Sequence, residues 1–371
     1  MSVALETHAA PPIDDVRVAA FRIPTDAPES DGTLAWNETG LVVVELGAGG
    51  ERGVGYTYAD ASVARLIADQ LEPRLRGCSF WDIDARWAEM FSHLRNLGRQ
   101  GLTAMAVSAL DVAMWDLKAK HLGVPLVRLF GCVREAVPIY GSGGFTSYSD
   151  VQLQRQFHGW AERGITRFKM KVGRDPARDR HRVRVARAAI GAAAELFVDA
   201  NSAYTRNQAL ECARMFVDEA DVRWLEEPLA PEDLAGLHFL RTRVPPQLEI
   251  AEGEYGYDLD YFQRLLTADA ADVVMPDATR CGGFTGFRQA AVLGEAARRP
   301  LSSHCAPGLH VAVGCAVAGL RHAEYFHDHA RIEHALFDGM PEPEGGVLRP
   351  DLSRPGHGLA FKWADAECYA V

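Results

Sequence analysis

Cysteine is scarce in this sequence, and its spacing points to neither a zinc centre nor a disulfide framework. Seven cysteines are scattered over 371 residues, with no Cys-x-x-Cys pair. Their count is odd, whereas stapled secreted domains pair their cysteines. We therefore expect reduced and mostly buried thiols in a cytosolic chain.

Targeting and membrane-spanning segments are also missing. Residues 1–14 contain no apolar core of the kind that a signal peptide needs, and residues 1–15 are expected to form a frayed arm. The longest apolar stretch, residues 309–320, is interrupted by glycine and too short to cross a bilayer. These absences predict a cytoplasmic protein with no membrane partner.

Basic residues are outnumbered: 39 Lys and Arg stand against 50 Asp and Glu, a formal charge of −11. Nucleic acid demands a basic face, so the balance argues against it as a partner. It also argues against steering of anionic substrates, unless the site is locally positive. Apolar residues make up 48% and charged residues 24%, as in a globular enzyme.

The first third of the chain predicts strands followed by helices. This order, without alternation, indicates a separate α+β domain. The glycine-rich residues 47–53 do not form a nucleotide-binding loop, because no helix follows them. The loop at residues 25–37 is longer than a connection requires, and we expect it to act as a lid. The expected strands are 16–21, 41–46 and 54–58, and the expected helices are about 61–71, 81–97 and 102–122.

From residue 137 onward, strands and helices alternate. Eight such strands with helices between them predict an α/β barrel. The sequence predicts capping boxes at Ser149 with Gln152 and at Thr205 with Gln208. Domain boundaries are expected at 1–132 for the α+β domain and 133–344 for the barrel, with 345–371 returning to the first domain. The expected strands are 137–140, 166–172, 196–200, 222–225, 248–251, 273–275, 301–303 and 323–326.

Carboxylates end three of these strands at regular spacing. Asp199, Glu226 and Glu254 follow short apolar runs and are 27 and 28 residues apart, about one strand, loop and helix per step. A barrel brings the carboxyl ends of its strands to one rim, so the three side chains would converge. Ligation by oxygen alone suits Mg²⁺, which also keeps positions open for substrate.

Two further groups end strands around the same rim. Lys169 and Lys171 lie on one face of a strand, because side chains alternate with period two. Repulsion between the two ammonium groups, together with burial, would lower a lysine pKa and create a general base. On the opposite wall Asp277 and His304 are 27 residues apart, and a carboxylate there would orient the imidazole as a second acid or base. Glu324 ends the last strand.

Each of these features also has an ordinary structural interpretation. A Lys-x-Lys pair is usually a solvated strand edge, and an isolated Asp or His at a strand end is commonly a cap. Structural ion pairs perturb pKa values too. All the features nevertheless fall on consecutive strand–helix units, at the end where barrels perform chemistry. Their joint occurrence favours a catalytic site.

In these motifs the sequence resembles the enolase superfamily, and within it the mandelate racemase subgroup. The resemblance covers nearly the whole chain. It implies an α/β fold in which an N-terminal α+β capping domain covers a modified (β/α)7β TIM-type barrel that lacks its last helix. The matching motifs are Lys169-Met170-Lys171, Val198-Asp199-Ala200-Asn201, Leu225-Glu226-Glu227-Pro228, Ala251-Glu252-Gly253-Glu254, Met275-Pro276-Asp277-Ala278 with Gly282-Gly283, Ser302-Ser303-His304, Glu324, and in the first domain Ala106-Val107-Ser108-Ala109-Leu110-Asp111 with Trp115-Asp116.

Carried over by position, the resemblance implies that Asp199, Glu226 and Glu254 bind Mg²⁺. Glu226, rather than Glu227, occupies the ligand place before the proline. Glu252 is the rival of Glu254, which is preferred because it follows the glycine as in the family.

The remaining strand-end residues match the catalytic groups of the family. Lys171 matches the lysine base, Lys169 its neighbour that holds the substrate carboxylate, and Asp277 with His304 the dyad on the other face. Glu324 matches an acid, expected to be protonated, that hydrogen-bonds a substrate carboxylate oxygen. Loss of the α-proton would then give an enediolate, with Mg²⁺, Lys169 and Glu324 facing its oxygens.

The predicted function is a Mg²⁺-dependent acid-sugar dehydratase yielding a 2-keto-3-deoxy acid, because the polar lid suits a hydroxylated substrate. A racemase or epimerase using the same two bases is the alternative. Muconate-cycloisomerase or dipeptide-epimerase chemistry is disfavoured, because that subgroup has a lysine on the sixth strand where this chain has Asp277. A silent binding protein would be expected to have lost some of the bases. We expect Tyr56, Ser142 and Asn201 to contact a small carboxylate substrate, and the chain to form a homo-oligomer.

Overall fold

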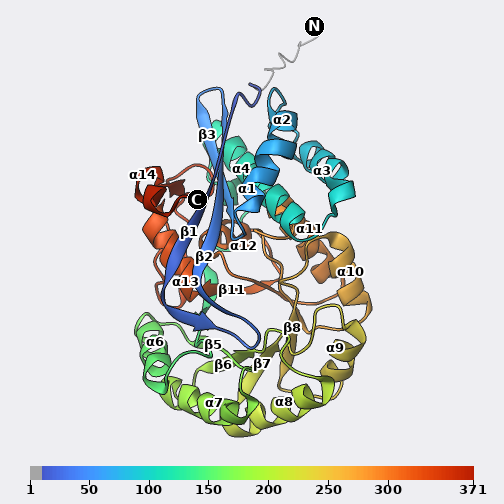
Figure 1. The fold of residues 1–371 in the computed structure, drawn as a ribbon, viewed down its shortest axis with the longest axis vertical. Coiled ribbons are helices and arrows are strands. Elements are labelled where there is room, and N and C mark those ends of the chain that lie inside the picture. Colours follow the sequence, from blue (N-terminus) through green and yellow to red (C-terminus); the bar gives the residue numbers. More distant parts are fainter. Residues whose placement is uncertain (1–10) are drawn as a thin grey trace.

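The computed structural model describes residues 11–371, and Figure 1 shows an N-terminal sheet with its helices above a barrel. The predicted frayed arm lies partly outside the described residues. Its end is ordered: Ile13 is buried, and its backbone N–H donates to Cys78 O at 2.9 Å. Within residues 11–371, no helix has both the length and the apolar character that crossing a membrane requires.

The N-terminal sheet is antiparallel, in the order β1-β2-β3, and α4 packs against it. Contact is close because Gly53 and Gly55 of β3 have no side chains. A Cβ atom at these positions would lie 2.2 Å from Ala113 O and 2.0 Å from Ala109 O of the helix. Helix α4 is buried on most of its surface, between this sheet and α11 of the barrel. The elements are β1 (Asp15–Ser30), β2 (Ala35–Ala48), β3 (Glu51–Thr57), α1 (Ser62–Leu66), the π-helix η1 (Ile67–Leu71), α2 (Glu72–Leu75), α3 (Ile83–His93), the 3₁₀ turn η2 (Leu94–Leu97), α4 (Leu102–His121) and α5 (Leu126–Phe130).

The segment predicted as a loop at residues 25–37 is instead mostly the end of a long hairpin. Strand β1 continues to Ser30, and β2 begins at Ala35. The register shifts between Pro24 and Glu29, beyond which Glu29 pairs with Trp36. Polar composition suggests a loop, but the two strands pair again at Glu29 and Ser30 after an irregular stretch at residues 25–28. This hairpin end, residues 24–37, is called the lid hairpin below, and Figure 1 shows it reaching down beside the barrel.

Eight parallel strands, β4 to β11, follow one another around the barrel, which closes between β11 and β4. Both predicted capping boxes are confirmed, at Ser149 with Gln152 and at Thr205 with Gln208. The strands are β4 (Val137–Gly143), β5 (Arg167–Lys171), β6 (Glu195–Asp199), β7 (Val222–Glu226), β8 (Glu249–Glu252), β9 (Val273–Val274), β10 (Leu301–Ser303) and β11 (Leu320–Phe326), and the helices are α6 (Asp150–Glu162), α7 (Pro176–Ile190), α8 (Arg206–Ala220), α9 (Leu234–Arg241), α10 (Leu259–Thr267), α11 (Gly283–Ala296), α12 (Pro307–Gly314) and α13 (His327–Leu336).

A layer of large side chains fills the barrel and sets the direction of the residues above it. Tyr140, Phe197 and Trp224 pack together inside, with ring centroids 5.1–6.3 Å apart. Side chains alternate along a strand, so the residues two positions later point inward as well. Those residues include Asp199 and Glu226, which are fully buried at the carboxyl end of the barrel.

A helix, α13, directly follows the last barrel strand, which differs from the prediction that this helix is missing. Its side chains bind the N-terminal sheet: Glu333 accepts a hydrogen bond from Tyr56 of β3, and Asp328 accepts one from Thr39 of β2. The chain end returns to the same sheet, where Val371 N–H donates to Ala20 O at 3.1 Å. The final elements are β12 (Phe337–Asp338), β13 (Val347–Leu348, antiparallel to β4), β14 (Ala360–Phe361), α14 (Trp363–Ala366) and the 3₁₀ turn η3 (Glu367–Tyr369).

Candidate active site and metal centre

Three carboxylates converge at the carboxyl ends of neighbouring strands. Asp199 ends β6 and Glu226 ends β7, and the two are paired in register. Glu254 follows β8. One oxygen from each side chain lies within 4.8 Å of the others, and all three residues are buried. The described residues therefore form an oxygen-lined cluster of the kind that hard divalent cations prefer.

Excess negative charge surrounds this cluster. Glu227 and Glu252 are also buried, and Glu252 has no hydrogen-bond partner for either oxygen among the described residues. Burial raises the pKa values of Glu226, Glu227 and Glu252 well above the ordinary range. Neighbouring carboxylates add to the shift in all three, and at Glu226 the opposing charge of Lys169 does not overcome it. Glu254 Oε2 is likewise buried without a hydrogen-bond partner. Buried unpaired carboxylates are costly, so the cluster fits a divalent cation.

Glu254, not its rival Glu252, joins Asp199 and Glu226 in this cluster. Ala251 belongs to the packed layer inside the barrel, so the neighbouring Glu252 points to the other side of the strand. Gly253, with φ of +137°, then turns the chain and brings Glu254 back to the rim. The same rim contains several non-glycine residues with left-handed backbones, such as Asn201 at φ +43° and Glu227 at φ +41°. Such strain clusters at functional sites.

The two lysines of β5 contact these carboxylates. Lys171 Nζ lies 2.5 Å from Asp199 Oδ2, and Lys169 Nζ contacts Glu226 and lies 2.7 Å from Glu324 Oε1. Burial disfavours their charge, but the carboxylates outweigh it and raise the pKa values of both lysines. The prediction that mutual repulsion lowers the lysine pKa is therefore wrong for this arrangement, because each ammonium has a closer carboxylate partner.

A histidine–aspartate pair forms the opposite side of the cluster. His304 Nδ1 lies 2.8 Å from Asp277 Oδ2, and His304 Nε2 lies 3.5 Å from Glu254 Oε2. Burial opposes the charge of Asp277, but His304 lowers its pKa below the ordinary value. With an ionised carboxylate at Nδ1, the other ring nitrogen, Nε2, faces the carboxylate cluster. Nε2 is therefore the atom that can accept or donate a proton there.

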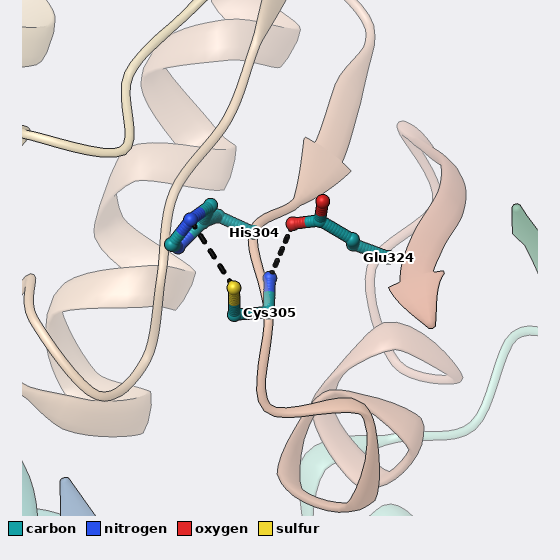
Figure 2. Close-up of side chains that lie close together, drawn as sticks. All are labelled: His304, Cys305 and Glu324. Atoms are coloured by element: carbon teal, nitrogen blue, oxygen red, sulfur yellow. Dashed lines mark hydrogen bonds between the residues drawn. The ribbon is translucent and has the colours of Figure 1, made fainter. Parts of the chain in front are cut away.

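Glu324 lies between Lys169 and the backbone after His304. Figure 2 shows Cys305 between the two side chains: its N–H donates to Glu324 Oε2 at 2.8 Å, and its Sγ lies 3.2 Å from His304 Nε2. Burial opposes ionisation of Glu324, yet Lys169 lowers its pKa below the ordinary value. The expected protonated acid is thus ionised in this arrangement, because Lys169 is its ion-pair partner.

Arg280 is a member of the site that the sequence did not reveal. Its guanidinium lies 3.2 Å from Glu254 Oε1 and 3.8 Å from Asp277 Oδ2. It therefore bridges the carboxylate cluster and the histidine–aspartate pair. The residue follows Asp277 by three positions, in the loop before α11. Its position after a strand end was the only available signal, and arginines in such loops are common.

The three predicted substrate contacts occupy different places. Ser142 follows Tyr140 on the inward side of β4, and its buried hydroxyl has no partner among the described residues. Asn201 lies beside the cluster, where its N–H donates to Asp199 Oδ1 at 3.0 Å. Tyr56 is not brought to the cluster; its buried hydroxyl donates to Glu333 at 2.7 Å. Ser142 and Asn201 thus lie near the carboxylates at the barrel rim, and Tyr56 belongs to the seam between sheet and barrel.

An apolar wall adjoins the two candidate bases. Lys171 Nζ lies 5.9 Å from the ring centroid of Phe326. The polar side chains of the lid hairpin do not form this wall: Asp26 contacts His327, Glu29 accepts from Trp36, and Asp31 accepts backbone N–H groups within its own turn. The polar lid is therefore not a sign of a hydroxylated substrate. The wall consists of Phe145, Tyr148, Cys305 and Phe326, with Ala27 and Trp36 of the lid hairpin packed against it.

Comparison with known proteins matches both parts of the chain to one family. Residues 15–131 match the mandelate racemase / muconate lactonizing enzyme N-terminal domain, and residues 152–366 match the enolase C-terminal domain-like family.

Curated relatives cover nearly the whole chain. A 3,6-anhydro-α-L-galactonate cycloisomerase of Streptomyces coelicolor is 34% identical over 94% of this chain and 97% of its own. An L-talarate/galactarate dehydratase of Salmonella typhimurium is 30% identical over 96% and 92% of the two chains.

Solved structures share the fold closely. A mandelate racemase/muconate lactonizing enzyme-like protein from Rubrobacter xylanophilus superposes with a TM-score of 0.95 at 49% identity, covering 97% of this chain and 100% of its own. A racemase from Streptomyces coelicolor with bound magnesium gives a TM-score of 0.91 at 32% identity, with the same coverage. The chain therefore belongs to the enolase superfamily, in its mandelate racemase/muconate lactonizing enzyme subgroup.

Proposed function

We propose that this enzyme is a Mg²⁺-dependent acid-sugar dehydratase that removes the proton α to a carboxylate and expels the β-hydroxyl, giving a 2-keto-3-deoxy acid. One observation carries the proposal: two acid–base groups contact different members of one carboxylate cluster. Lys171 lies 2.5 Å from Asp199, and His304 lies 3.5 Å from Glu254. A substrate carboxylate placed at the cluster would have its α-carbon between them.

Asp199, Glu226 and Glu254 would hold the metal ion. Their buried oxygens, one of them without a hydrogen-bond partner, suit a hard divalent cation. When bound, Mg²⁺ would supply positive charge beside the substrate carboxylate, where negative charge accumulates as the α-proton leaves. Related structures were solved with magnesium, which supports this choice of ion.

On the lysine side, Lys171 takes the α-proton and Lys169 binds a carboxylate oxygen of the substrate. Lys171 can act only as a neutral amine, so its ion pair with Asp199 has to be relieved before turnover. Glu324 donates a hydrogen bond to the substrate only after it gains a proton. Substrate binding therefore has to break the ion pair between Lys169 and Glu324, which are 2.7 Å apart.

On the histidine side, His304 gives a proton to the leaving β-hydroxyl, which departs as water. Asp277 at Nδ1 keeps Nε2 directed at the substrate and stabilises the imidazolium. The enol that remains takes up a proton at C3 and loses its C2 hydroxyl proton, which gives the keto acid. All these groups lie within one buried site, and the lid hairpin excludes bulk water from it.

A racemase or epimerase of a 2-hydroxy carboxylate is the second candidate, because the same two bases could exchange the α-proton from opposite faces. Relatives support both kinds of chemistry: an L-talarate/galactarate dehydratase and a structure described as a racemase are each about a third identical to this chain. The dehydratase is preferred because dehydratases of sugar acids recur among the curated relatives.

A screen of purified protein with Mg²⁺ against a library of acid sugars tests the proposal. The dehydratase predicts that at least one acid yields a 2-keto acid, detected as its semicarbazone, and that EDTA abolishes the product. Inversion of a 2-hydroxy acid, followed by polarimetry and without keto-acid formation, would favour the racemase instead. A library that gives neither product would contradict both.

A further inference from the structure

A second cluster of metal-ligand groups lies outside the catalytic site, where the lid hairpin meets the barrel. Asp26 and Glu29 come from β1, and His327 is the first residue of α13. One potential ligand atom from each lies within 4.8 Å of the others. His327 Nε2 is 3.0 Å from Asp26 Oδ2. The cluster thus joins two segments about 300 residues apart in the chain.

Glu29 is the unusual member, because it is a buried carboxylate with an unsatisfied oxygen. Only 1% of its surface is exposed. Its Oε2 accepts a hydrogen bond from Trp36 Nε1 at 2.8 Å, whereas Oε1 is buried without a partner among the described residues. Burial, and then the charges of Asp328 and Asp26, raise the pKa of Glu29 to about 8. An unpaired buried carboxylate is expensive unless a proton or a cation neutralises it.

The charges around the cluster carry a net negative charge that a divalent cation would balance. Asp328 contributes a third carboxylate, and Arg331 contributes one guanidinium, which is ion-paired to Asp328 and bonded to the backbone of Pro24. With Glu29 ionised and His327 neutral, three carboxylates stand against one guanidinium. A divalent ion would balance that difference.

We propose that Asp26, Glu29 and His327 bind a divalent transition-metal ion of the Zn²⁺ type, which fastens the lid hairpin to the barrel. One imidazole and two carboxylates are a ligand set that Zn²⁺ accepts, with a fourth position left for water. Mg²⁺ prefers oxygen ligands alone, so the imidazole separates this site from the catalytic cluster.

Such an ion would influence the active site indirectly, by fixing the segments that form the apolar wall. His327, the first residue of α13, follows Glu324 of β11 by three residues. The lid hairpin supplies Ala27 and Trp36 to the apolar wall that contains Cys305. Fastening Asp26 and Glu29 to His327 would hold that wall in place. The ion is structural in this proposal and touches no reacting atom.

Metal counting with matched variants tests the site. Wild-type protein with saturating Mg²⁺ is dialysed against Zn²⁺, and bound zinc is measured by atomic emission. Wild type should retain one more equivalent than Glu29→Gln, and Asp26→Asn should bind that equivalent at least about 10-fold more weakly. Glu38→Gln, which alters an exposed carboxylate on the other strand of the hairpin, should behave as wild type. Equal zinc in wild type, Glu29→Gln and Asp26→Asn would overturn the proposal.

Cobalt and hydrogen exchange separate this site from the other clusters. Co²⁺ bound by Asp26, Glu29 and His327 should show visible bands without a thiolate charge-transfer band, whereas a Cys305-ligated ion would show one. Zn²⁺ should slow amide exchange at residues 24–31 in wild type and not in Glu29→Gln. Slowing that is equal in both proteins, or a thiolate band that accounts for all the bound cobalt, would contradict the assignment.

Discussion

Lys171 Nζ lies 2.5 Å from Asp199 Oδ2, so the proposed base is ion-paired with a proposed metal ligand. This contact explains why the lysine has a raised pKa, where the sequence predicted a lowered one. The contact also couples metal binding by Asp199 to proton transfer by Lys171. Any group that neutralises Asp199 lowers the pKa of Lys171, because the largest favourable interaction of the ammonium is with that carboxylate.

Mg²⁺ binding and activity should depend on Glu254, which lies in the carboxylate cluster, and not on Glu252. Glu254→Gln removes a member of the cluster and should abolish tight Mg²⁺ binding and activity, whereas Glu252→Gln should keep both. Calorimetric titration with Mg²⁺ measures the difference. EDTA should stop wild-type turnover, and added Mg²⁺ should restore it. Both variants should fold, because the barrel core does not depend on the ion. Full affinity in Glu254→Gln with loss in Glu252→Gln would show that the wrong carboxylate was assigned.

Asp277→Asn should lower kcat by about 100-fold or more while leaving the fold intact. The asparagine amide has nearly the same shape as the Asp277 carboxylate, which lies 2.8 Å from His304 Nδ1, but it has no negative charge to stabilise an imidazolium. Circular dichroism serves as the folding control. A kcat within about twofold of wild type would mean that His304 acts without its aspartate.

Substrate binding should order the lid hairpin. Loops that cover a site come from the less stable part of a fold, and amide exchange at residues 25–37 should slow when a substrate analogue binds in the presence of Mg²⁺. Residues 206–220, in α8 on the outside of the barrel, provide an internal control whose exchange should not change. Unchanged exchange in the hairpin would count against a capping role.

Stability should depend on pH through Glu333. This buried carboxyl accepts hydrogen bonds from Tyr56 and from Gly308 N–H, and burial raises its pKa from 4.5 to about 7. Between these values the folded chain keeps a proton that the unfolded chain has lost, so stability falls as pH rises, by up to about 1.4 kcal/mol per pH unit. Glu333→Gln should flatten this slope. Urea unfolding at several pH values measures it, and an unchanged slope would contradict the assignment.

The alternation of strands and helices was sufficient to predict the barrel. Both capping boxes were found where the sequence places them, because Ser149 and Thr205 act through contacts three residues away. The regular spacing of Asp199, Glu226 and Glu254 predicted their convergence for a similar reason: a barrel repeats one unit per strand. These signals are local or periodic, so a single sequence contains them.

Other features depend on partners that the sequence does not place. The predicted direction of the lysine pKa shift is wrong. Repulsion between the two lysines of β5 can be inferred from the sequence, whereas their short distances to Asp199, Glu226 and Glu324 cannot. Tyr56 was expected at the substrate, but Glu333 of α13 holds it in the seam. The apolar wall was missed because its members come from separated segments of the chain.

The central claim is that Lys171 and His304 serve the same substrate carbon in different roles, and α-proton exchange in D₂O tests it most directly. With a dehydrated substrate from the screen, His304→Asn should still exchange the α-proton and fail to expel the β-hydroxyl, whereas Lys171→Ala should block exchange altogether. Both variants must retain Mg²⁺ binding for the comparison. If both variants dehydrate the substrate at the wild-type rate, neither residue is the acid or the base, and the proposed mechanism is wrong.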